Sequence, residues 1–313
     1  MSTYKDVLPR LPRFITTDFS SSEDNLCGCE AVLAANDGRG PGLRKARRIT
    51  FKVRSILNEG GVSGLGLSIA KEFLKNGLRG VTLMDINEEN GHDVDTSLKN
   101  EYGPEKVIFF KGNVTNSSEF EGAFKKTIEV FNNIDIVVNS AGVADEVDAK
   151  KSIDINLGGV LTGTYLAMDN YLPKYKTMQH PVIVNISSIF GLDGIACFIV
   201  YTATKHAVLG IGKCLSTKEH FQATGAKIIT ICPGVTETPL VSTCKALPGR
   251  YDDIAQEIVP KFYAQQPHVV SRALVKILNI CETGDVWIIE DDKCKQVEIP
   301  DRFSMKVLKT LDV

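Results

Sequence analysis

Three residues in the second half of the chain, Ser188, Tyr201 and Lys205, have types and a spacing that suit proton transfer. Tyr201 and Lys205 are four positions apart, so on a helix their side chains share one face and can interact. A free tyrosine has a pKa of about 10 and supplies little phenolate at neutral pH, but a nearby ammonium group favours the anion. Ser188 follows the apolar stretch 182–186, a predicted buried strand, and is placed to hydrogen-bond the same reacting oxygen. We therefore predict that Tyr201, activated by Lys205, is a general acid or base.

A cluster of glycines in the first half predicts a site for a dinucleotide. The apolar pattern over residues 49–57 predicts a strand, and residues 67–74 predict a helix, with the glycines between them. In such a unit the backbone N–H groups of the turn and the helix N-terminus receive a pyrophosphate. The residues expected to contact it are Gly60, Ser63, Gly64, Leu65 and Gly66.

An acidic residue predicts which dinucleotide is bound. The second apolar stretch, 80–85, ends in Asp85, which lies about 20 residues beyond the glycine turn. An acid at this place binds the ribose hydroxyls of NAD and repels the additional phosphate of NADP. Ile86 and Asn87 follow, so no basic residue compensates. NAD is the expected cofactor, and NADP-dependent carbonyl reduction is the less favoured alternative.

Strand and helix patterns alternate along the rest of the chain. They predict an α/β fold: a single-domain, Rossmann-type, doubly wound parallel sheet over residues 49–301. Residues 1–48 are rich in loop-forming and helix-breaking residues, and we expect a poorly ordered N-terminal extension there. Residues 302–313 are expected to be a C-terminal tail.

In order and spacing, these motifs resemble the short-chain dehydrogenase/reductase family. The features that carry the resemblance are the glycine turn, Asn139-Ser140-Ala141-Gly142, Asn156, the Ser188/Tyr201/Lys205 set, and Pro233-Gly234 followed by Thr238. Within the family, residues 201–206, 232–236 and 297–301 are most similar to the 15-hydroxyprostaglandin dehydrogenase-like and insect alcohol dehydrogenase-like group.

The resemblance implies a set of roles for the matching residues. Asn156 would complete a catalytic tetrad with Ser188, Tyr201 and Lys205 by supporting a proton relay, and Lys205 would also hold the nicotinamide ribose. Further cofactor contacts are implied for Asn113, Val114, Asn139, Ala141, Gly142, Tyr201, Pro233, Gly234, Val235 and Thr238. The implied activity is NAD-dependent interconversion of a secondary alcohol and its ketone, with a hydroxy-lipid of prostaglandin type as one candidate substrate.

One departure from the family pattern keeps a second function open. The family usually has Thr before the first glycine, whereas this chain has Glu59, and the preceding stretch includes Lys52, Arg54 and Ser55. The first strand of a parallel sheet is normally buried on both faces and almost continuously apolar. A carboxylate near the pyrophosphate is also unfavourable. The alternative is a non-catalytic family member that acts as a binding or storage protein.

Composition limits the classes of molecule that this chain is expected to bind. A net charge of −2 gives no electrostatic reason to expect nucleic acid, and no apolar run reaches the roughly 18 residues of a membrane-spanning helix. The eight cysteines form no Cys-x-x-Cys pair, so we expect no metal site and a reducing, cytoplasmic location. We expect a small-molecule alcohol or ketone as substrate, and the resemblance implies a homodimer or homotetramer. Residues that suit an apolar substrate are Cys244, Leu247, Tyr251, Ile258 and Phe262.

Overall fold

The computed structural model describes residues 53–301 and Ser304. The predicted N-terminal extension (1–48), the first residues of the predicted first strand (49–52) and the predicted tail apart from Ser304 lie outside the described residues. Within them, eight strands form one sheet in the order β3-β2-β1-β4-β5-β6-β7-β8. All neighbouring strands are parallel except β8, which pairs antiparallel with β7 at the edge.

The strands are short and are connected mainly by helices. The strands are β1 (Ser55–Glu59), β2 (Gly80–Asp85), β3 (Val107–Lys111), β4 (Ile136–Asn139), β5 (Val182–Ile186), β6 (Lys227–Pro233), β7 (Val286–Glu290) and β8 (Lys293–Val297). The α-helices are α1 (Gly64–Lys75), α2 (Glu88–Tyr102), α3 (Ser117–Phe131), α4 (Ala149–Ile153), α5 (Val160–Tyr165), α6 (Leu172–Tyr175), α7 (Ile199–Leu215), α8 (Lys218–Thr224), α9 (Pro239–Thr243), α10 (Arg250–Ile258) and α11 (Pro267–Ile277). The π-helical turns η2 (Asp154–Gly159) and η3 (Leu166–Tyr171) join α4, α5 and α6 into one long helix, and η4 (Ile189–Gly191) and η5 (Val259–Lys261) are single 3-10 turns.

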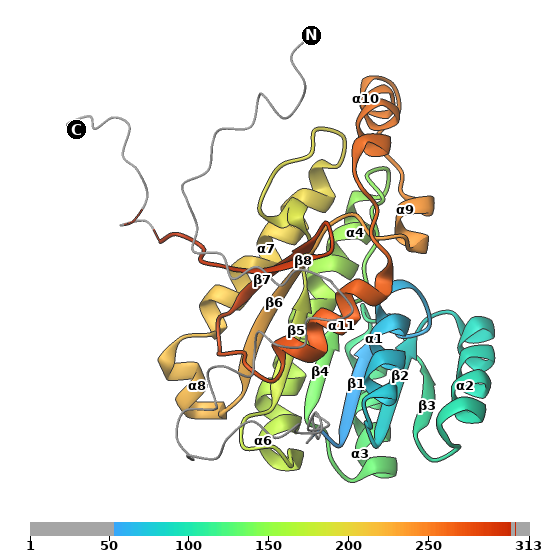
Figure 1. Ribbon diagram of the computed structural model, residues 1–313, viewed down its shortest axis with the longest axis vertical. Coiled ribbons are helices and arrows are strands. Elements are labelled where there is room, and N and C mark those ends of the chain that lie inside the picture. Colours follow the sequence, from blue (N-terminus) through green and yellow to red (C-terminus); the bar gives the residue numbers. More distant parts are fainter. Residues whose placement is uncertain (1–52, 302–303, 305–313) are drawn as a thin grey trace, which may run out of the picture.

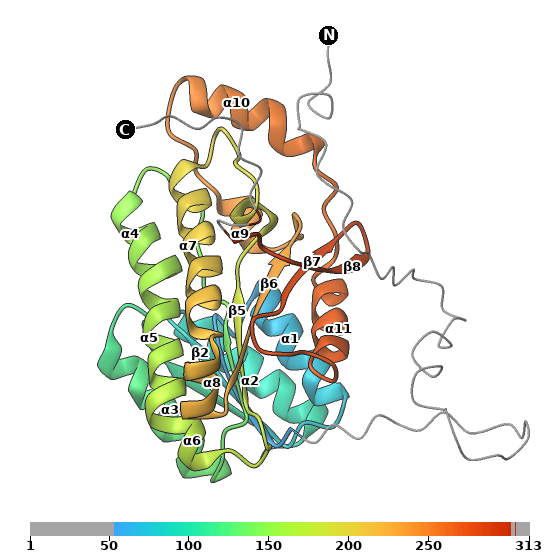
Figure 2. The same cartoon turned by 90° about the vertical axis from the view of Figure 1, so that its left-hand side faces the viewer.

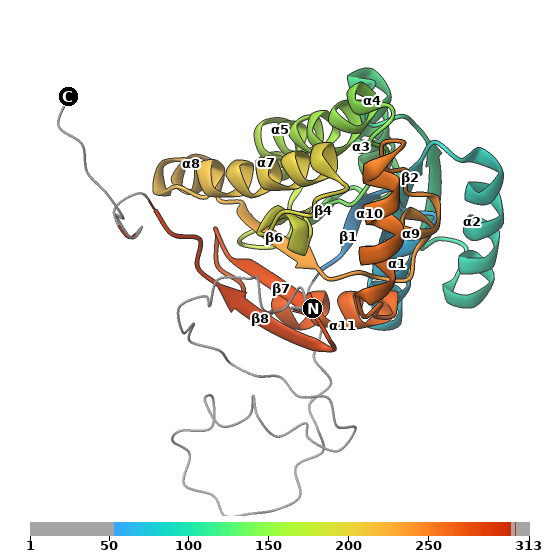
Figure 3. The same ribbon diagram turned by 90° about the horizontal axis from the view of Figure 1, so that it is seen from above.

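Two helical layers enclose the sheet (Figure 3). Helices α1, α2 and α11 cover one face, where Phe73 and Leu274 belong to one buried apolar cluster. Helices α3, α5 and α7 cover the other, where Phe120 and Phe124 belong to a second cluster. The predicted doubly wound sheet is thereby confirmed.

The strand order reverses between β1 and β4, and ligands of such sheets bind beyond the carboxyl ends of the strands at that point. Helices α9 and α10 stand beyond those ends (Figure 1).

Strand β1 forms in spite of its polar residues. All five of its residues are buried. Each polar side chain makes at least one hydrogen bond, and the buried Asn58 Oδ1 is left without one. The Ser55 hydroxyl donates to the Asn133 carbonyl (2.5 Å), the Asn58 amide donates to the Gly66 carbonyl (2.7 Å), and the Glu59 carboxylate accepts from the Ala141 N–H (2.6 Å). Buried polar groups are tolerated when they are hydrogen-bonded, so these contacts replace the apolar packing expected of a central strand.

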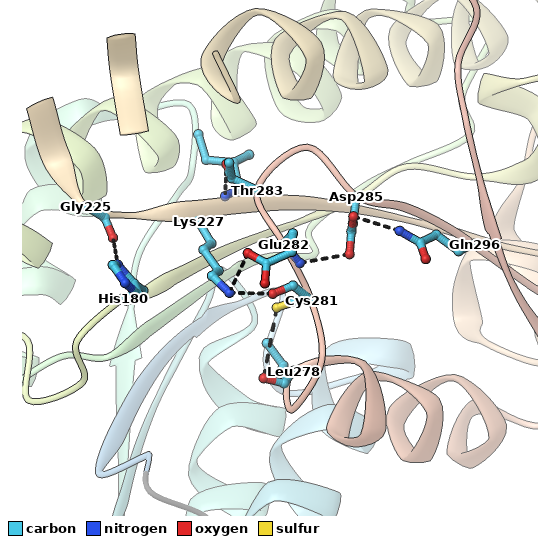
Figure 4. Close-up of polar contacts among 10 residues, drawn as sticks. His180, Gly225, Lys227, Leu278, Cys281, Glu282, Thr283, Asp285 and Gln296 are labelled. Carbon is cyan, nitrogen blue, oxygen red and sulfur yellow. Dashed lines mark hydrogen bonds and ion pairs between the residues drawn. The ribbon is translucent and has the colours of Figure 1, made fainter. Parts of the chain in front are cut away.

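At the opposite end of the sheet, polar contacts fix the start of β6 against the turn between α11 and β7 (Figure 4). The Lys227 ammonium donates to the Cys281 carbonyl (2.6 Å) and pairs with the Glu282 carboxylate (3.0 Å). The Thr283 hydroxyl accepts from the Ile228 N–H (3.2 Å). These contacts anchor β6, whose other end carries Pro233 into the predicted cofactor site.

None of the helices that the structure describes has the length and apolar character needed to cross a bilayer. Among the described residues, no group of three or more His, Cys, Asp or Glu side chains could hold a metal ion.

Candidate active site

A cleft of about 380 Å³ opens at the carboxyl ends of the strands, at the β1/β4 reversal. It brings together residues that the sequence spreads over almost 180 positions. The predicted site residues that line it are Gly60, Ser63, Gly64, Leu65, Gly66, Asp85, Asn113, Val114, Ala141, Gly142, Ser188, Tyr201, Lys205, Pro233, Gly234, Val235 and Thr238. Of the predicted set, only Asn139 and Asn156 lie outside the lining.

The glycine turn has the geometry of a phosphate cradle. Gly60 and Gly64 have φ angles of +65° and +49°, a region that side chains disfavour. A Cβ on Gly66 would lie 2.1 Å from the Gly60 carbonyl oxygen, so only glycine permits this close approach. Helix α1 begins here, and its fully described first turn contains no acidic side chain. Its free N–H groups and the positive end of its dipole therefore favour an anionic ligand.

Asp85 ends β2 at the edge of the same cleft. Its carboxylate accepts hydrogen bonds from the Asn87 N–H (3.0 Å) and the Val62 N–H (3.3 Å). These contacts hold the acid next to the glycine turn, where the sequence predicted a partner for ribose hydroxyls. The backbone N–H groups of the glycine turn and the carboxylate of Asp85 thus fit a dinucleotide such as NAD.

The three predicted catalytic side chains meet on the other side of the cleft. Tyr201 lies in the first turn of α7, and Ser188, just after β5, hydrogen-bonds its phenol. The Lys205 ammonium lies 5.6 Å from the centre of the Tyr201 ring and donates to the Ile186 carbonyl (3.0 Å). The Ser187 hydroxyl donates to the Lys205 carbonyl (2.8 Å), which ties α7 to the end of β5.

Burial shifts the pKa values of this group in the direction of the neutral forms. It raises the pKa of Tyr201 to about 12, and the hydrogen bond from Ser188 acts in the opposite direction. It lowers the pKa of Lys205 to about 8. The sequence predicted that Lys205 lowers the pKa of Tyr201, but in the protein without a bound cofactor the pKa of Tyr201 is raised. The reason is that desolvation dominates, and the ammonium group is bonded to the Ile186 carbonyl.

Asn156 lies behind the cleft and holds the loop that follows β4. Its amide accepts from the Val143 N–H (2.8 Å) and donates to the Val143 carbonyl (2.8 Å) and the Thr204 hydroxyl (3.2 Å). The Thr204 hydroxyl in turn donates to the Tyr201 carbonyl (2.8 Å). Figure 2 shows the long helix of Asn156 beside α7. Asn156 is thus a positioning residue in this structure, and its part in a proton relay stays a prediction.

Asn139 requires a correction. It ends β4 with its side chain fully buried, and its amide donates to Asn185 (2.7 Å) and Thr164 (3.1 Å). It does not line the cleft, because its side chain is directed between β5 and α5. The expected cofactor contact is replaced by a structural link beneath the cleft floor.

The sequence did not reveal one carboxylate, Glu146. It is 3% exposed, and its oxygens accept from the Val200 N–H (2.8 Å) and the Tyr201 N–H (2.9 Å). It therefore caps the helix that carries Tyr201. No spacing pattern signals this role, because the partners are backbone groups more than fifty positions away.

The loop of Glu146 also contacts the segment that covers the cleft. Asp145 forms a parallel bridge with Lys245. The Lys245 N–H donates to the Ala144 carbonyl (2.8 Å), and the Glu146 N–H donates to the Lys245 carbonyl (2.9 Å). The Lys245 ammonium pairs with the Asp145 carboxylate at 3.3 Å. We call residues 144–146 and 244–246 together the rim ladder.

The part of the cleft next to Tyr201 is apolar. Its side chains include Phe190, Ile195, Phe198, Val259 and Phe262. Among the described residues of the lining, Lys205 is the only Lys, Arg or His. Of the residues that the sequence assigned to an apolar substrate, Cys244 and Phe262 line the cleft, whereas Leu247, Tyr251 and Ile258 do not.

Comparison with known proteins agrees with this geometry. Residues 54–247 match the family model described as short chain dehydrogenase. The chain belongs to the short-chain dehydrogenase family. A relative from Rattus norvegicus, named 15-hydroxyprostaglandin dehydrogenase [NAD(+)], is 30% identical over 225 residues, which cover 70% of this chain and 84% of the relative. Alcohol dehydrogenase 1 from Ceratitis capitata is 26% identical, with 75% of this chain and 91% of the relative covered.

Solved structures support the fold of this short-chain dehydrogenase. A short-chain dehydrogenase/reductase from Burkholderia phymatum, in complex with NAD, superposes with a TM-score of 0.64 at 20% identity. The match covers 74% of this chain and 87% of that structure.

Proposed function

We propose that this short-chain dehydrogenase uses NAD to interconvert a secondary alcohol and its ketone. The observation that carries the proposal is the meeting of Ser188, Tyr201 and Lys205 in one cleft with the glycine turn and Asp85. The names of the rat and Ceratitis relatives, an NAD-dependent hydroxyprostaglandin dehydrogenase and an alcohol dehydrogenase, support the same reaction type.

Each side chain has a defined task in alcohol oxidation. Tyr201 accepts the proton of the substrate hydroxyl as a phenolate. Because burial raises its pKa to about 12, this anion has to be favoured by the positive charge that bound NAD and Lys205 would place in the cleft. Ser188 orients the oxygen that carries the proton. Lys205 supplies positive charge beside this oxygen, and Asn156 and Glu146 hold the elements that present the other groups. Bound NAD supplies the hydride acceptor. Fixed orientation and placed charge are the protein's contribution to the rate.

The apolar walls near Tyr201 favour a substrate with a hydrocarbon chain, such as a hydroxy-lipid of prostaglandin type. Phe190 and Phe262 pack edge to face, with ring centres 5.3 Å apart, and form one wall of the cleft. An alkyl chain against this wall would gain about 0.8 kcal/mol for each buried methylene group.

The non-catalytic alternative depended on two features that the structure now explains. Strand β1 forms with at least one hydrogen bond from each of its polar side chains, and Glu59 is directed to the Ala141 N–H and does not line the cleft. Neither feature blocks the cradle, so the enzyme is favoured over a binding or storage protein. Asp85 likewise favours NAD over NADP.

The test is the substitution Tyr201→Phe, which removes the proton acceptor and leaves the ring in place. We expect turnover of secondary alcohols to fall at least about 100-fold, while the Kd for NAD, measured by fluorescence titration, stays within about twofold. Retained turnover would refute the role of Tyr201. If the wild-type protein does not bind NAD, the binding or storage function gains support.

We also propose the assembly, location and limits of the enzyme. A homodimer or homotetramer is supported by the family resemblance and by the exposed apolar residues Ile153, Tyr165 and Ile199 on α4, α5 and α7. Light scattering that gives a monomer mass would contradict it.

The six cysteines in the described part are free, which supports a reducing compartment such as the cytoplasm. The domain limits 49–301 remain a prediction.

A further inference from the structure

Glu59 is a buried acid at the junction of two cofactor-binding segments. It precedes Gly60, is 1% exposed, and its carboxylate accepts from the Ala141 N–H at 2.6 Å. A Cβ on Gly60 would lie 2.9 Å from the backbone N of Ala141, so the glycine turn and the loop after β4 are in close contact here. The carboxyl group therefore lies where the glycine turn meets the loop after β4, without lining the cleft.

Two charged groups act on Glu59 from neighbouring elements. Lys205 on α7 attracts its negative charge, and Asp85 at the end of β2 repels it. Burial outweighs the attraction and raises the pKa of Glu59 to about 8, whereas burial lowers the pKa of Lys205, also to about 8. A proton on Glu59 thus titrates within the working range of an enzyme.

We propose that Glu59 takes up a proton from solvent when a dinucleotide binds, so that this carboxyl group links cofactor affinity to pH. The pyrophosphate brings negative charge to the glycine turn that begins next to Glu59, and nearby negative charge favours the neutral acid. By linkage, the ligand then binds more tightly to the protonated protein. The inference depends on the proposed function only in requiring that the cleft binds NAD.

The test uses ADP-ribose, which carries the pyrophosphate and lacks the nicotinamide. Calorimetric titrations at pH 6 to 9.5, in two buffers of different ionisation enthalpy, give both Kd and the number of protons taken up. For the wild type we expect proton uptake near pH 8 and an affinity that falls by up to about tenfold per pH unit above it. Glu59→Gln keeps an oxygen for the Ala141 N–H and removes the titration, so its affinity should fall less steeply.

A matched control separates Glu59 from other acids whose pKa is raised by burial. Glu290 ends β7, away from the glycine turn, and burial also raises its pKa. Glu290→Gln should keep the wild-type pH dependence for ADP-ribose. Lys205 titrates in all three proteins, and Glu59→Gln also removes a charge that raises the pKa of Lys205. The proton is therefore assigned to Glu59 by a second measurement.

Infrared difference spectra of the wild type measure the protonation of a carboxyl group directly, and the Glu59→Gln variant assigns the band. Adding ADP-ribose to the wild type near pH 8 should increase the band of a protonated carboxyl group, and in Glu59→Gln this increase should be missing. Equal pH slopes in wild type and Glu59→Gln, or no carboxyl band in the wild type, would overturn the inference. Absence of ADP-ribose binding at every pH would instead contradict the proposed function.

Discussion

The carboxylate of Glu146 holds the backbone N–H of Tyr201 at 2.9 Å, while its other oxygen holds the N–H of Val200 at 2.8 Å. Both N–H groups belong to the first turn of α7 and have no partner within the helix. A buried acid at a helix N-terminus also interacts favourably with the helix dipole. Glu146 therefore fixes the position of the proposed proton acceptor from outside the cleft.

Glu146→Gln should lower both stability and turnover. The amide of Gln offers one acceptor to the two N–H groups, so we expect a loss of about 1–2 kcal/mol of unfolding free energy. The kcat should fall severalfold, with the Kd for NAD unchanged, because only the placement of Tyr201 is affected. Urea unfolding and steady-state kinetics measure the two effects.

Asn116→Ala is the matched control for this substitution. The Asn116 side chain accepts from the N–H groups of Ser118 and Glu119 at the start of α3. Its loss should cost similar stability and leave kcat unchanged at saturating NAD. An equal loss of kcat in both variants would show that Glu146 acts through general stability alone.

Asn156→Ala should disorder the loop after β4. The substitution removes the contacts with Val143 and Thr204 and leaves the half-buried N–H and carbonyl of Val143 unpaired, at a cost of up to about 1–3 kcal/mol each. We expect a lower unfolding free energy and a kcat reduced more than tenfold. A kcat within twofold of the wild type would exclude both the positioning role and the predicted relay.

Asp85→Ser should relax the choice of cofactor. The serine lacks the charge that repels the phosphate of NADP, and it binds the ribose hydroxyls of NAD less strongly. The ratio of kcat/KM for NAD to that for NADP should fall at least about tenfold, which corresponds to about 1.4 kcal/mol. Asp93→Ser, an exposed substitution on α2, should leave the ratio unchanged.

Glu59 should make the ligand-free protein less stable as pH rises. Its pKa is raised from 4.5 to about 8 in the folded state, so between these values the folded protein holds a proton that the unfolded chain has lost. Stability from this group is full below pH 4.5 and is lost as pH rises to about 8. Compared with the wild type, Glu59→Gln should therefore gain unfolding free energy between pH 5 and pH 8. Parallel stability curves would contradict the raised pKa.

Phe262→Ala should weaken binding of long-chain alcohols selectively. Phe262 lines the apolar wall and contacts Phe190, and an aromatic side chain contributes about 1.5–3 kcal/mol when buried. The KM of a long-chain secondary alcohol should rise about tenfold or more, with little change for propan-2-ol. Tyr263→Ala removes the neighbouring side chain, which is 59% exposed, and should leave both KM values unchanged.

The sequence could predict what depends on short spacing. The alternation of strands and helices gave the doubly wound sheet, and local motifs located the glycine turn, Asp85 and the Ser188/Tyr201/Lys205 group. Contacts between distant residues could not be predicted, because nothing in the sequence near Glu59 or Glu146 indicates Ala141 or Tyr201. The same limit explains the error on Asn139, whose partners lie on another strand and helix. It also explains the pKa of Tyr201, which depends on burial by the whole fold.

The rim ladder joins two segments that lie 100 positions apart in the chain. Its two main-chain hydrogen bonds and the Asp145–Lys245 ion pair attach the segment after α9 to the loop that supports α7. If the segment after α9 moves outward to release product, its hydrogen bond to Glu146 would pull on the first turn of α7, which carries Tyr201. Product release and the loss of catalytic alignment would then be a single mechanical event.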